Sequence, residues 1–320
     1  MAINLSGILL PITTPFSSNE EFDTEGLAGN LERWNNAGII GYVILGSTGE
    51  RVSLDETEYL RVIESARRAV PERLIFVAGA GQQSTRGTIK EIERAAGAGA
   101  EAVLVITPSF YKSAITQKAL DEFYRTVADT ARVPIVLYSM PDLTGITIEP
   151  ETAARLSEHE NIIGMKDSSA DIVKFAETVR QVPDGFAMLI GNGTVFSEAL
   201  QACARGGILA VGCAVPKLCM EIYEAVQASD TDRAKALQDR LTPLARAVTK
   251  TYGIGGLKTA MDLSGLVGGA VRSPLRRPDE SAAAEIARLL NQANEALEKL
   301  PTDAARSATG SSLAHQGPDA

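Results

Sequence analysis

Eight short apolar runs recur along this chain and are separated by longer amphipathic runs. The short runs show little alternation of polar and apolar residues, which is typical of parallel strands that are buried on both faces. Because strands and helical runs alternate, the pattern predicts a parallel sheet covered by helices. The predicted strands are residues 7–13, 41–45, 74–78, 102–106, 135–138, 162–166, 186–190 and 207–211.

The spacing of these strands favours a closed barrel. Their carboxyl ends follow one another at steps of 21 to 33 residues, and eight such units close a (β/α)8 barrel. An open doubly wound sheet is the alternative, but it usually carries a glycine-rich dinucleotide loop after its first strand. Residues 13–16 here are Thr-Thr-Pro-Phe, which is not such a loop. The predicted fold class is therefore α/β, a (β/α)8 TIM barrel with a C-terminal helical appendage.

After Val215 the pattern predicts helices only. We expect the barrel in residues 1–215, a barrel-closing helix and a C-terminal helical bundle in 216–300, and a disordered polar tail in 301–320. The glycine-rich residues 253–256 are interpreted as a turn between two of the later helices. The predicted helices are residues 27–37, 56–69, 85–98, 118–129, 150–157, 172–179 and 195–205, and then 218–228, 232–249, 256–263 and 279–300.

The charge pattern argues against several classes of partner. The chain carries a formal net charge of −9 and lacks the clustered basic residues with which proteins bind nucleic acid. Arg272, Arg276 and Arg277 form a small basic group, which we interpret as a solvated turn or as ion pairs between subunits. No apolar run approaches the length of a membrane span. The start of the chain has no basic residue ahead of its apolar run, unlike a signal peptide.

Two residue types bear on location and on metal chemistry. Cys203, Cys213 and Cys219 lack the short paired spacings of zinc or redox motifs, so we predict buried thiols in a cytoplasmic protein. The only histidines are His159, interpreted as a surface residue, and His315 in the tail, so neither a histidine-rich metal site nor a Ser-His-Asp triad is expected. We predict no metal and no cofactor.

Lys166 is the strongest candidate for a reacting group. It ends the buried sixth strand, and residues 167–169 (Asp-Ser-Ser) favour a helix start directly after it. The carboxyl ends of parallel strands are where barrel enzymes place their chemistry. A neutral lysine amine attacks a ketone to form a Schiff base, and desolvation favours the neutral form. A lysine that only forms an ion pair is the alternative.

The ends of two other strands, the fifth and the second, strengthen the case for chemistry. Tyr138 ends the preceding strand, where its hydroxyl could relay protons, although it could also be an ordinary core tyrosine. Residues 46–50 (Gly-Ser-Thr-Gly-Glu) follow the second strand and offer two hydroxyls and several backbone amides in a tight turn. Such a turn can bind a carboxylate, although by itself it could be a plain glycine turn.

Three motifs together resemble the dihydrodipicolinate synthase / N-acetylneuraminate lyase superfamily of Schiff-base aldolases. They are Gly-Ser-Thr-Gly-Glu at 46–50, Tyr-Ser-Met-Pro at 138–141 with Thr-Gly at 144–145, and Gly-Met-Lys-Asp at 164–167, and the resemblance runs from about residue 5 to 300. It implies that Lys166 forms the imine with pyruvate or another 2-oxo acid and that Tyr138 relays protons. It also implies that Ser47 and Thr48 bind the substrate carboxylate, and that the backbone carbonyl of Ile208 faces the bound oxo acid.

The resemblance further implies a shared active site. Members of the superfamily complete the relay with a tyrosine from a neighbouring subunit, in a Thr-Pro-aromatic segment after the fourth strand. That segment is residues 107–111 here, and Tyr111 is the matching residue. Ser47 would then link the two tyrosine hydroxyls, which requires a homo-oligomer, a dimer or a homotetramer.

Departures from the family pattern bear on the substrate. Dihydrodipicolinate synthases usually have arginine two residues after the proline of the tyrosine motif, where this chain has Leu143. The segments around Tyr138, Lys166 and residues 248–258 are most similar to 4-hydroxy-2-oxoglutarate aldolases, which release pyruvate and glyoxylate, and Ser168 would lie near the aldehyde-side carboxylate. The alternatives are 4-hydroxy-tetrahydrodipicolinate synthase, an aldolase or dehydratase of 2-keto-3-deoxy sugar acids, and a non-catalytic binding barrel.

Overall fold

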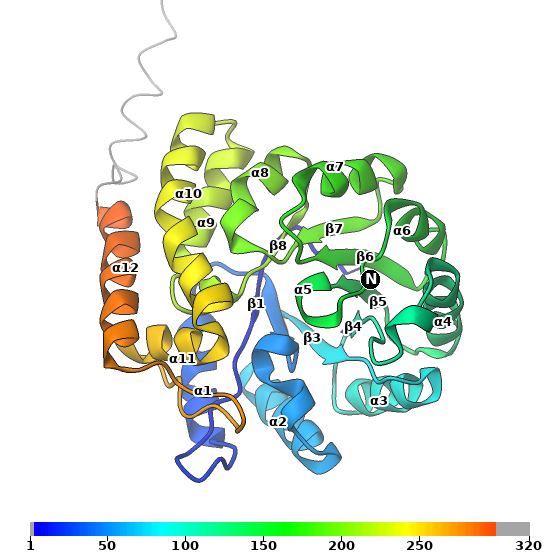
Figure 1. Ribbon diagram of the computed structural model, residues 1–320, viewed down its shortest axis with the longest axis horizontal. Helices are drawn as coiled ribbons and strands as arrows, with labels where there is room; N and C mark the ends of the chain where they lie inside the picture. Colours follow the sequence, from blue (N-terminus) through cyan, green and yellow to red (C-terminus); the bar gives the residue numbers. More distant parts are fainter. Residues whose placement is uncertain (1–2, 299–320) are drawn as a thin grey trace, which may run out of the picture.

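The computed structural model describes residues 3–298, and within them eight parallel strands close into a barrel in chain order (Figure 1). Strand β8 pairs with β1, which removes both edges of the sheet. The (β/α)8 prediction is therefore confirmed. The strands are β1 Gly7–Pro11, β2 Gly41–Ile44, β3 Ile75–Ala80, β4 Ala102–Ile106, β5 Ile135–Ser139, β6 Ile162–Asp167, β7 Ala187–Ile190 and β8 Gly206–Ile208.

Helices cover the outside of this barrel. Most begin at a side-chain cap. At the start of α2, for example, the Asp55 carboxylate accepts from the Glu58 N–H, and the Glu58 carboxylate accepts from the Asp55 N–H. The helices around the barrel are α1 Thr24–Trp34, α2 Glu56–Ala69, α3 Thr85–Gly97, α4 Gln117–Thr130, α5 Pro141–Thr144, α6 Pro150–Leu156, α7 Ile172–Gln181 and α8 Phe196–Gln201. The later ones are α9 Pro216–Gln227, α10 Thr231–Arg246, α11 Gly253–Leu263 and α12 Glu280–Glu298.

Figure 1 shows α9, α10, α11 and α12 gathered on one side of the barrel, beside α1. Helix α10 packs on α9 and α12, and α11 packs on α12. This is the predicted C-terminal helical appendage. No helix in the described part of the chain is long and apolar enough to cross a membrane. The boundary at residue 215 stays a prediction, and the predicted tail with His315 lies outside the described residues.

The apolar residues form two layers. One fills the inside of the barrel, where alternate residues of each strand point inward, and the other lies between the strands and the helices. The inner layer includes Leu9, Val43, Val77, Leu104, Val136 and Leu189. Because the lower and middle parts of the barrel are packed with these side chains, polar chemistry is confined to the ends of the strands.

Several element boundaries differ from the predictions. Strand β8 ends at Ile208 instead of residue 211, because residues 210–213 turn into a 3-10 helix. The glycines at 253–256 do not form a plain turn but begin α11, and five residues of π-helix, Ala247–Thr251, precede them. Cys203 is exposed, so its predicted burial was wrong, whereas Cys213 and Cys219 are buried and burial raises the pKa of both thiols. His159 is only partly exposed.

Candidate active site

Lys166 and Tyr138 lie opposite each other on neighbouring strands. They are register partners on β6 and β5, and both are almost fully buried. The Lys166 Nζ lies 4.3 Å from the centroid of the Tyr138 ring. Among residues 3–298 no carboxylate forms an ion pair with Lys166. The amine is therefore placed against an aromatic face rather than in the ion pair that the alternative interpretation required.

The turn after β2 reaches the same place from another strand. Residues Ser47–Gly49 form one 3-10 turn, and the Ser47 Oγ lies 2.9 Å from the Tyr138 hydroxyl oxygen. The hydrogen bond joins residues 91 positions apart in the sequence. Lys166, Tyr138 and Ser47 therefore form one connected group at the carboxyl ends of β2, β5 and β6.

The other predicted site residues also lie at the ends of strands, namely Thr48 after β2, Ser168 after β6 and Ile208 at the end of β8. Thr48 is buried in the same 3-10 turn as Ser47. Ser168 follows β6 directly, and its N–H donates to the Ser139 carbonyl at 3.0 Å. Ile208 is buried inside the barrel and is the register partner of Leu9. The roles expected for Thr48, Ser168 and the Ile208 backbone carbonyl in substrate binding stay predictions.

Gly191 is a site residue that the motifs did not reveal. It follows β7, and its N–H donates to the Asp167 carbonyl at 2.6 Å. A β-carbon on Gly191 would lie 2.5 Å from Lys166 Cε and would overlap Ser168 Oγ. Glycine is therefore needed here because it leaves room for the lysine side chain. Its place directly after a strand was the only signal in the sequence.

Asp167 is a second buried titratable residue beside the lysine. It is the last residue of β6 and lies on the outer side of the strand from Lys166. Burial raises the pKa of its carboxyl, and a hydrogen bond of 2.7 Å from the Ser169 N–H opposes that rise. Asp167 thus closes the start of the loop after β6 instead of facing the amine.

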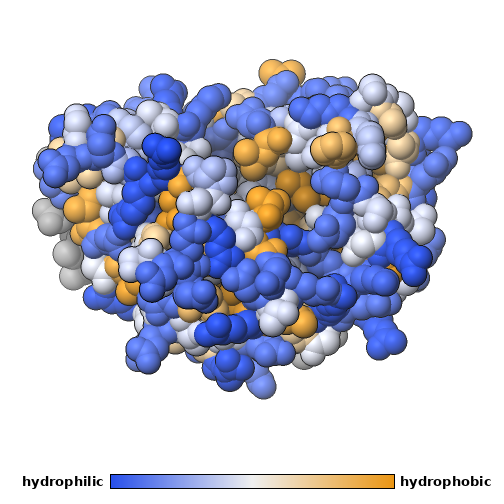
Figure 2. Space-filling view, turned by 60° about the horizontal axis from the view of Figure 1, so that its bottom comes forward, coloured by the Kyte–Doolittle hydropathy of each residue, from blue (hydrophilic) through white to orange (hydrophobic). Residues whose placement is uncertain are grey.

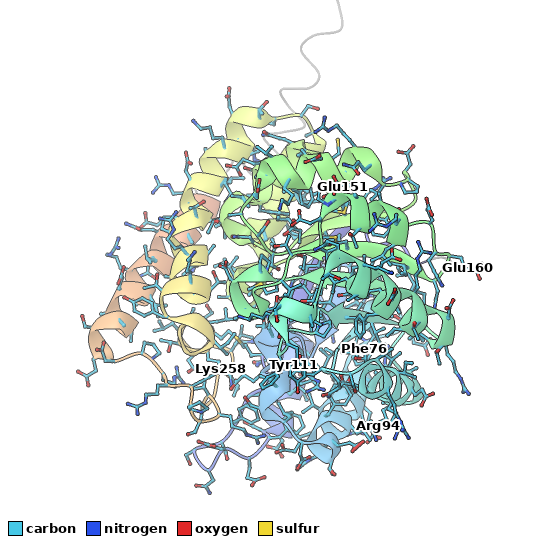
Figure 3. The ribbon with its side chains drawn as sticks, turned by 45° about the vertical axis from the view of Figure 1, so that its right-hand side comes forward. Phe76, Arg94, Tyr111, Glu151, Glu160 and Lys258 are labelled. Carbon is cyan, nitrogen blue, oxygen red and sulfur yellow. The ribbon has the colours of Figure 1, made fainter. Side chains whose placement is uncertain are left out.

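Tyr111 does not reach this group within one chain. Its side chain is 70% exposed and meets Phe110, which is 76% exposed, edge to ring at a centroid distance of 5.1 Å. Figure 3 labels Tyr111 near the middle of the view, between Lys258 and Phe76. Two large exposed aromatic side chains in sequence are unusual on a single chain and are typical of a protein interface.

Leu143 lies on the short helix α5, directly after the tyrosine motif. Its side chain is 62% exposed. Figure 2 shows one face of the molecule that is mostly hydrophilic, with hydrophobic groups gathered around a hollow. An exposed leucine on α5 offers no charge to an anionic substrate group, which bears on the choice of substrate.

Comparisons with known proteins show the family to which the chain belongs. The model of the dihydrodipicolinate synthetase family matches residues 4–293. A 4-hydroxy-tetrahydrodipicolinate synthase of Mesorhizobium japonicum is 35% identical over 289 residues, which cover 88% of this chain and 96% of the relative. A synthase of the same name from Methanopyrus kandleri is 34% identical over 283 residues, 88% of this chain and 93% of that one.

Solved structures give the same result. The chloride-inhibited dihydrodipicolinate synthase of Acinetobacter baumannii, solved with pyruvate, has a TM-score of 0.84 and 27% identity and covers 91% of this chain and 99% of its own. YagE, an E. coli prophage protein of the dihydrodipicolinic acid synthase family, also solved with pyruvate, has a TM-score of 0.85 and 26% identity over 91% and 99%. The predicted superfamily is confirmed, and the chain belongs to the dihydrodipicolinate synthetase family of lyases.

Proposed function

We propose that this lyase forms a Schiff base between Lys166 and the ketone of pyruvate or a pyruvate-yielding 2-oxo acid. The observation that supports it most is the connected group of Lys166, Tyr138 and Ser47 at the barrel mouth. A buried amine next to a hydroxyl pair has both a nucleophile and a route for protons. The names of the relatives and the pyruvate in two solved relatives support the same substrate class.

The proposed reaction assigns each residue one task. The neutral Lys166 amine adds to the C2 carbonyl, and the resulting carbinolamine loses water to give a protonated imine. Tyr138 moves these protons, with Ser47 holding its hydroxyl at 2.9 Å. In the cleavage direction the C4 hydroxyl loses a proton and C4 leaves as the carbonyl carbon of an aldehyde, while the electron pair of the broken C3–C4 bond enters the imine and gives an enamine. Protonation of C3 and addition of water release pyruvate and the free lysine.

Reductive trapping tests this proposal. Borohydride reduces an imine to a stable secondary amine, so wild-type protein incubated with pyruvate and borohydride should gain one pyruvate-derived adduct on Lys166. Lys166→Met keeps the length of the side chain and should gain no adduct, which makes it the matched control. A folded wild-type protein that stays unlabelled at saturating pyruvate would refute the Schiff base.

The comparisons favour 4-hydroxy-tetrahydrodipicolinate synthase over the 4-hydroxy-2-oxoglutarate aldolase that the motifs suggested. Three relatives that match nearly the whole chain carry the synthase name, at 30 to 35% identity. On this assignment pyruvate, bound as an enamine on Lys166, adds to aspartate semialdehyde instead of being released by cleavage.

One observation keeps the aldolase as a second candidate. Leu143 is exposed on α5 at the position where such synthases usually place an arginine for the semialdehyde carboxylate. Leucine cannot supply the charge-assisted hydrogen bonds that arginine gives to a carboxylate. A dehydratase of 2-keto-3-deoxy acids would use the same imine and is distinguished by its product.

A substrate panel separates these candidates. Pyruvate with aspartate semialdehyde should give the heterocyclic product if the chain is the synthase, and 4-hydroxy-2-oxoglutarate should give glyoxylate if it is the aldolase. The variant Leu143→Arg should raise kcat/KM for aspartate semialdehyde about tenfold, the value of about one additional charged hydrogen bond. No change would show that residue 143 does not contact the acceptor.

We also propose that the working enzyme is a homo-oligomer in which Tyr111 enters the site of a neighbouring subunit. The exposed pair of Phe110 and Tyr111 supports it, since burying both rings against a partner would remove them from water. Sedimentation at micromolar concentration should give a dimer or a tetramer. A monomer with full activity would refute the shared site.

A further inference from the structure

A buried ion pair lies directly behind the turn that carries Ser47 and Thr48. The Lys258 Nζ of α11 is 2.5 Å from the Glu50 Oε1, and the two side chains are 0% and 1% exposed. Figure 3 shows Lys258 between the C-terminal helices and the N-terminal part of the chain. Charges that are buried this deeply are rarely retained without a partner, so each of the two depends on the other.

The Lys258 ammonium is fully coordinated. Besides Glu50 it donates to the carbonyl oxygens of Thr14 at 2.7 Å and Ala270 at 2.5 Å, and its Nζ lies 4.6 Å from the Phe16 ring centroid. Three acceptors match the three protons of an ammonium group. Burial lowers the pKa of Lys258, and the Glu50 carboxylate opposes that effect. The oxygen atoms around Nζ suit an ammonium group, which makes Lys258 the partner of Glu50 rather than a second nucleophile.

Glu50 is held in an unusual conformation by this arrangement. Its backbone has φ 55° and ψ 32°, the left-handed region that residues other than glycine seldom adopt. Its other carboxylate oxygen, Oε2, accepts from the Arg272 N–H at 2.9 Å. The structure therefore keeps a strained backbone at the end of the 3-10 turn, which requires that surrounding contacts hold it in place.

A second tether leads from Lys258 to the same turn. Thr14, whose carbonyl accepts from Lys258, donates its Oγ1 to the Gly49 carbonyl at 2.7 Å. The turn is thus fixed at residue 49 through Thr14 and at residue 50 through the carboxylate. Ser47 and Thr48 are the residues immediately before these two anchors.

Arg272 links Glu50 to residues that follow it in the chain. Its guanidinium binds both oxygens of the Glu58 carboxylate, each at 2.7 Å, and donates to the Ser53 carbonyl at 2.9 Å. This pair within one chain replaces the solvated turn or intersubunit contact expected for Arg272. The C-terminal segment thereby holds the chain at Glu50 and at the residues after it, Ser53 and Glu58.

We propose that Glu50 and Lys258 are positioning residues, which hold the Ser47–Thr48 turn in the place where it receives the carboxylate of the 2-oxo acid. This inference rests on the proposed function, because it assigns the carboxylate site to that turn. It gives the C-terminal helices a role in substrate binding, although they contribute no side chain to the group of Lys166, Tyr138 and Ser47.

Three variants test the proposal. Glu50→Gln keeps an acceptor for the Arg272 N–H but removes the charge, Lys258→Met removes the ammonium at similar length, and the double variant removes both charges. A displaced turn should raise KM for pyruvate about tenfold or more, because the lost contacts hold the substrate carboxylate, and kcat should fall as well because Ser47 on the same turn holds the Tyr138 hydroxyl. Half-saturation of borohydride labelling should shift by the same factor.

The control is Arg277→Met. Arg277 forms an ion pair of 2.7 Å with Asp262 of α11, the helix that carries Lys258, and its guanidinium donates to Gly269 and Thr259 rather than to the turn. It should leave KM and half-saturation at wild-type values. The melting temperature of each variant is measured alongside, because a single variant leaves one buried charge without its partner.

The double variant separates positioning from general stability. It should recover melting temperature relative to Lys258→Met, since no unpaired charge remains, while KM stays raised. If KM returns to the wild-type value along with stability, or if Glu50→Gln labels with unchanged half-saturation, the positioning role is refuted. Failure of the wild type to label would instead refute the Schiff base itself, so the two proposals fail in distinguishable ways.

Discussion

Gly191→Ala would place a methyl group in the space that the Lys166 side chain occupies. The added carbon would lie 2.5 Å from Lys166 Cε, whereas unbonded carbon atoms rest about 3.5 Å apart or more. The lysine, or the strand end that carries residue 191, must therefore move by about 1 Å. A misplacement of about 1 Å at a reacting group lowers the rate about 100-fold, which corresponds to about 2.7 kcal/mol in transition-state stabilisation.

The measurement is kcat/KM for pyruvate-forming or pyruvate-consuming turnover, together with the rate of borohydride labelling at Lys166. Gly185→Ala is the matched control, because it lies just before the same strand and its added β-carbon meets no atom within 4 Å. We expect the control to match the wild type in both assays. If Gly191→Ala also kept wild-type kcat/KM, the clearance around Lys166 would not be a requirement of the site.

The remaining predictions concern the two tyrosines and the rim of the barrel. Tyr138→Phe keeps the ring next to the amine but removes the hydroxyl bonded to Ser47, so kcat should fall about 100- to 10,000-fold; an unchanged kcat in steady-state assays would exclude a relay through this residue. Tyr111→Phe should lower kcat about 100-fold or more without changing the oligomer seen by sedimentation, and unchanged turnover would argue that Tyr111 plays no relay role. Binding to Arg272 lowers the pKa of Glu58 below 4.5, so the pair stabilises the fold above that pH and the contribution is lost as the pH falls through the lowered pKa. Glu58→Gln should therefore cost about 1 kcal/mol in urea unfolding at pH 7 and leave acid stability equal to wild type, whereas an equal loss at both pH values would contradict this linkage.

The barrel was predictable because parallel strands buried on both faces require continuous apolar runs. Seven of the eight predicted strands lie within two residues of the observed bounds at each end, because the buried apolar runs mark where these strands lie. The largest differences at the carboxyl ends are in β1 and β8, which end two and three residues earlier than predicted, and only β8 exceeds two residues. There the chain leaves the ladder for side-chain contacts, such as Thr13 Oγ1 with Met261 Sδ, and for the 3-10 turn at 210–213.

Local pattern failed where a distant partner decides the conformation. Residues 253–256 were expected to form a turn because glycine disfavours helix, but tertiary contacts keep them in α11: a β-carbon on Gly255 would lie against the Arg276 backbone. Cys203 is the opposite case, because the tertiary structure exposes a residue that the local pattern predicted to be buried. Its apolar neighbours predicted burial, yet it has φ 67° at the end of α8 and its side chain is exposed.

The sequence by itself determined which reactive side chains are present and at which end of the barrel they lie. Lys166, Tyr138 and Ser47 could be chosen because each stands at the carboxyl end of a predicted strand, and strand ends of a parallel barrel meet at one face. Only the tertiary structure decided the contacts between distant residues. These are the space that Gly191 leaves for the Lys166 side chain, and the Glu50–Lys258 ion pair behind the turn of Ser47 and Thr48. These contacts join residues far apart in the chain, so no local spacing encodes them, and the residues meet only once the barrel has closed.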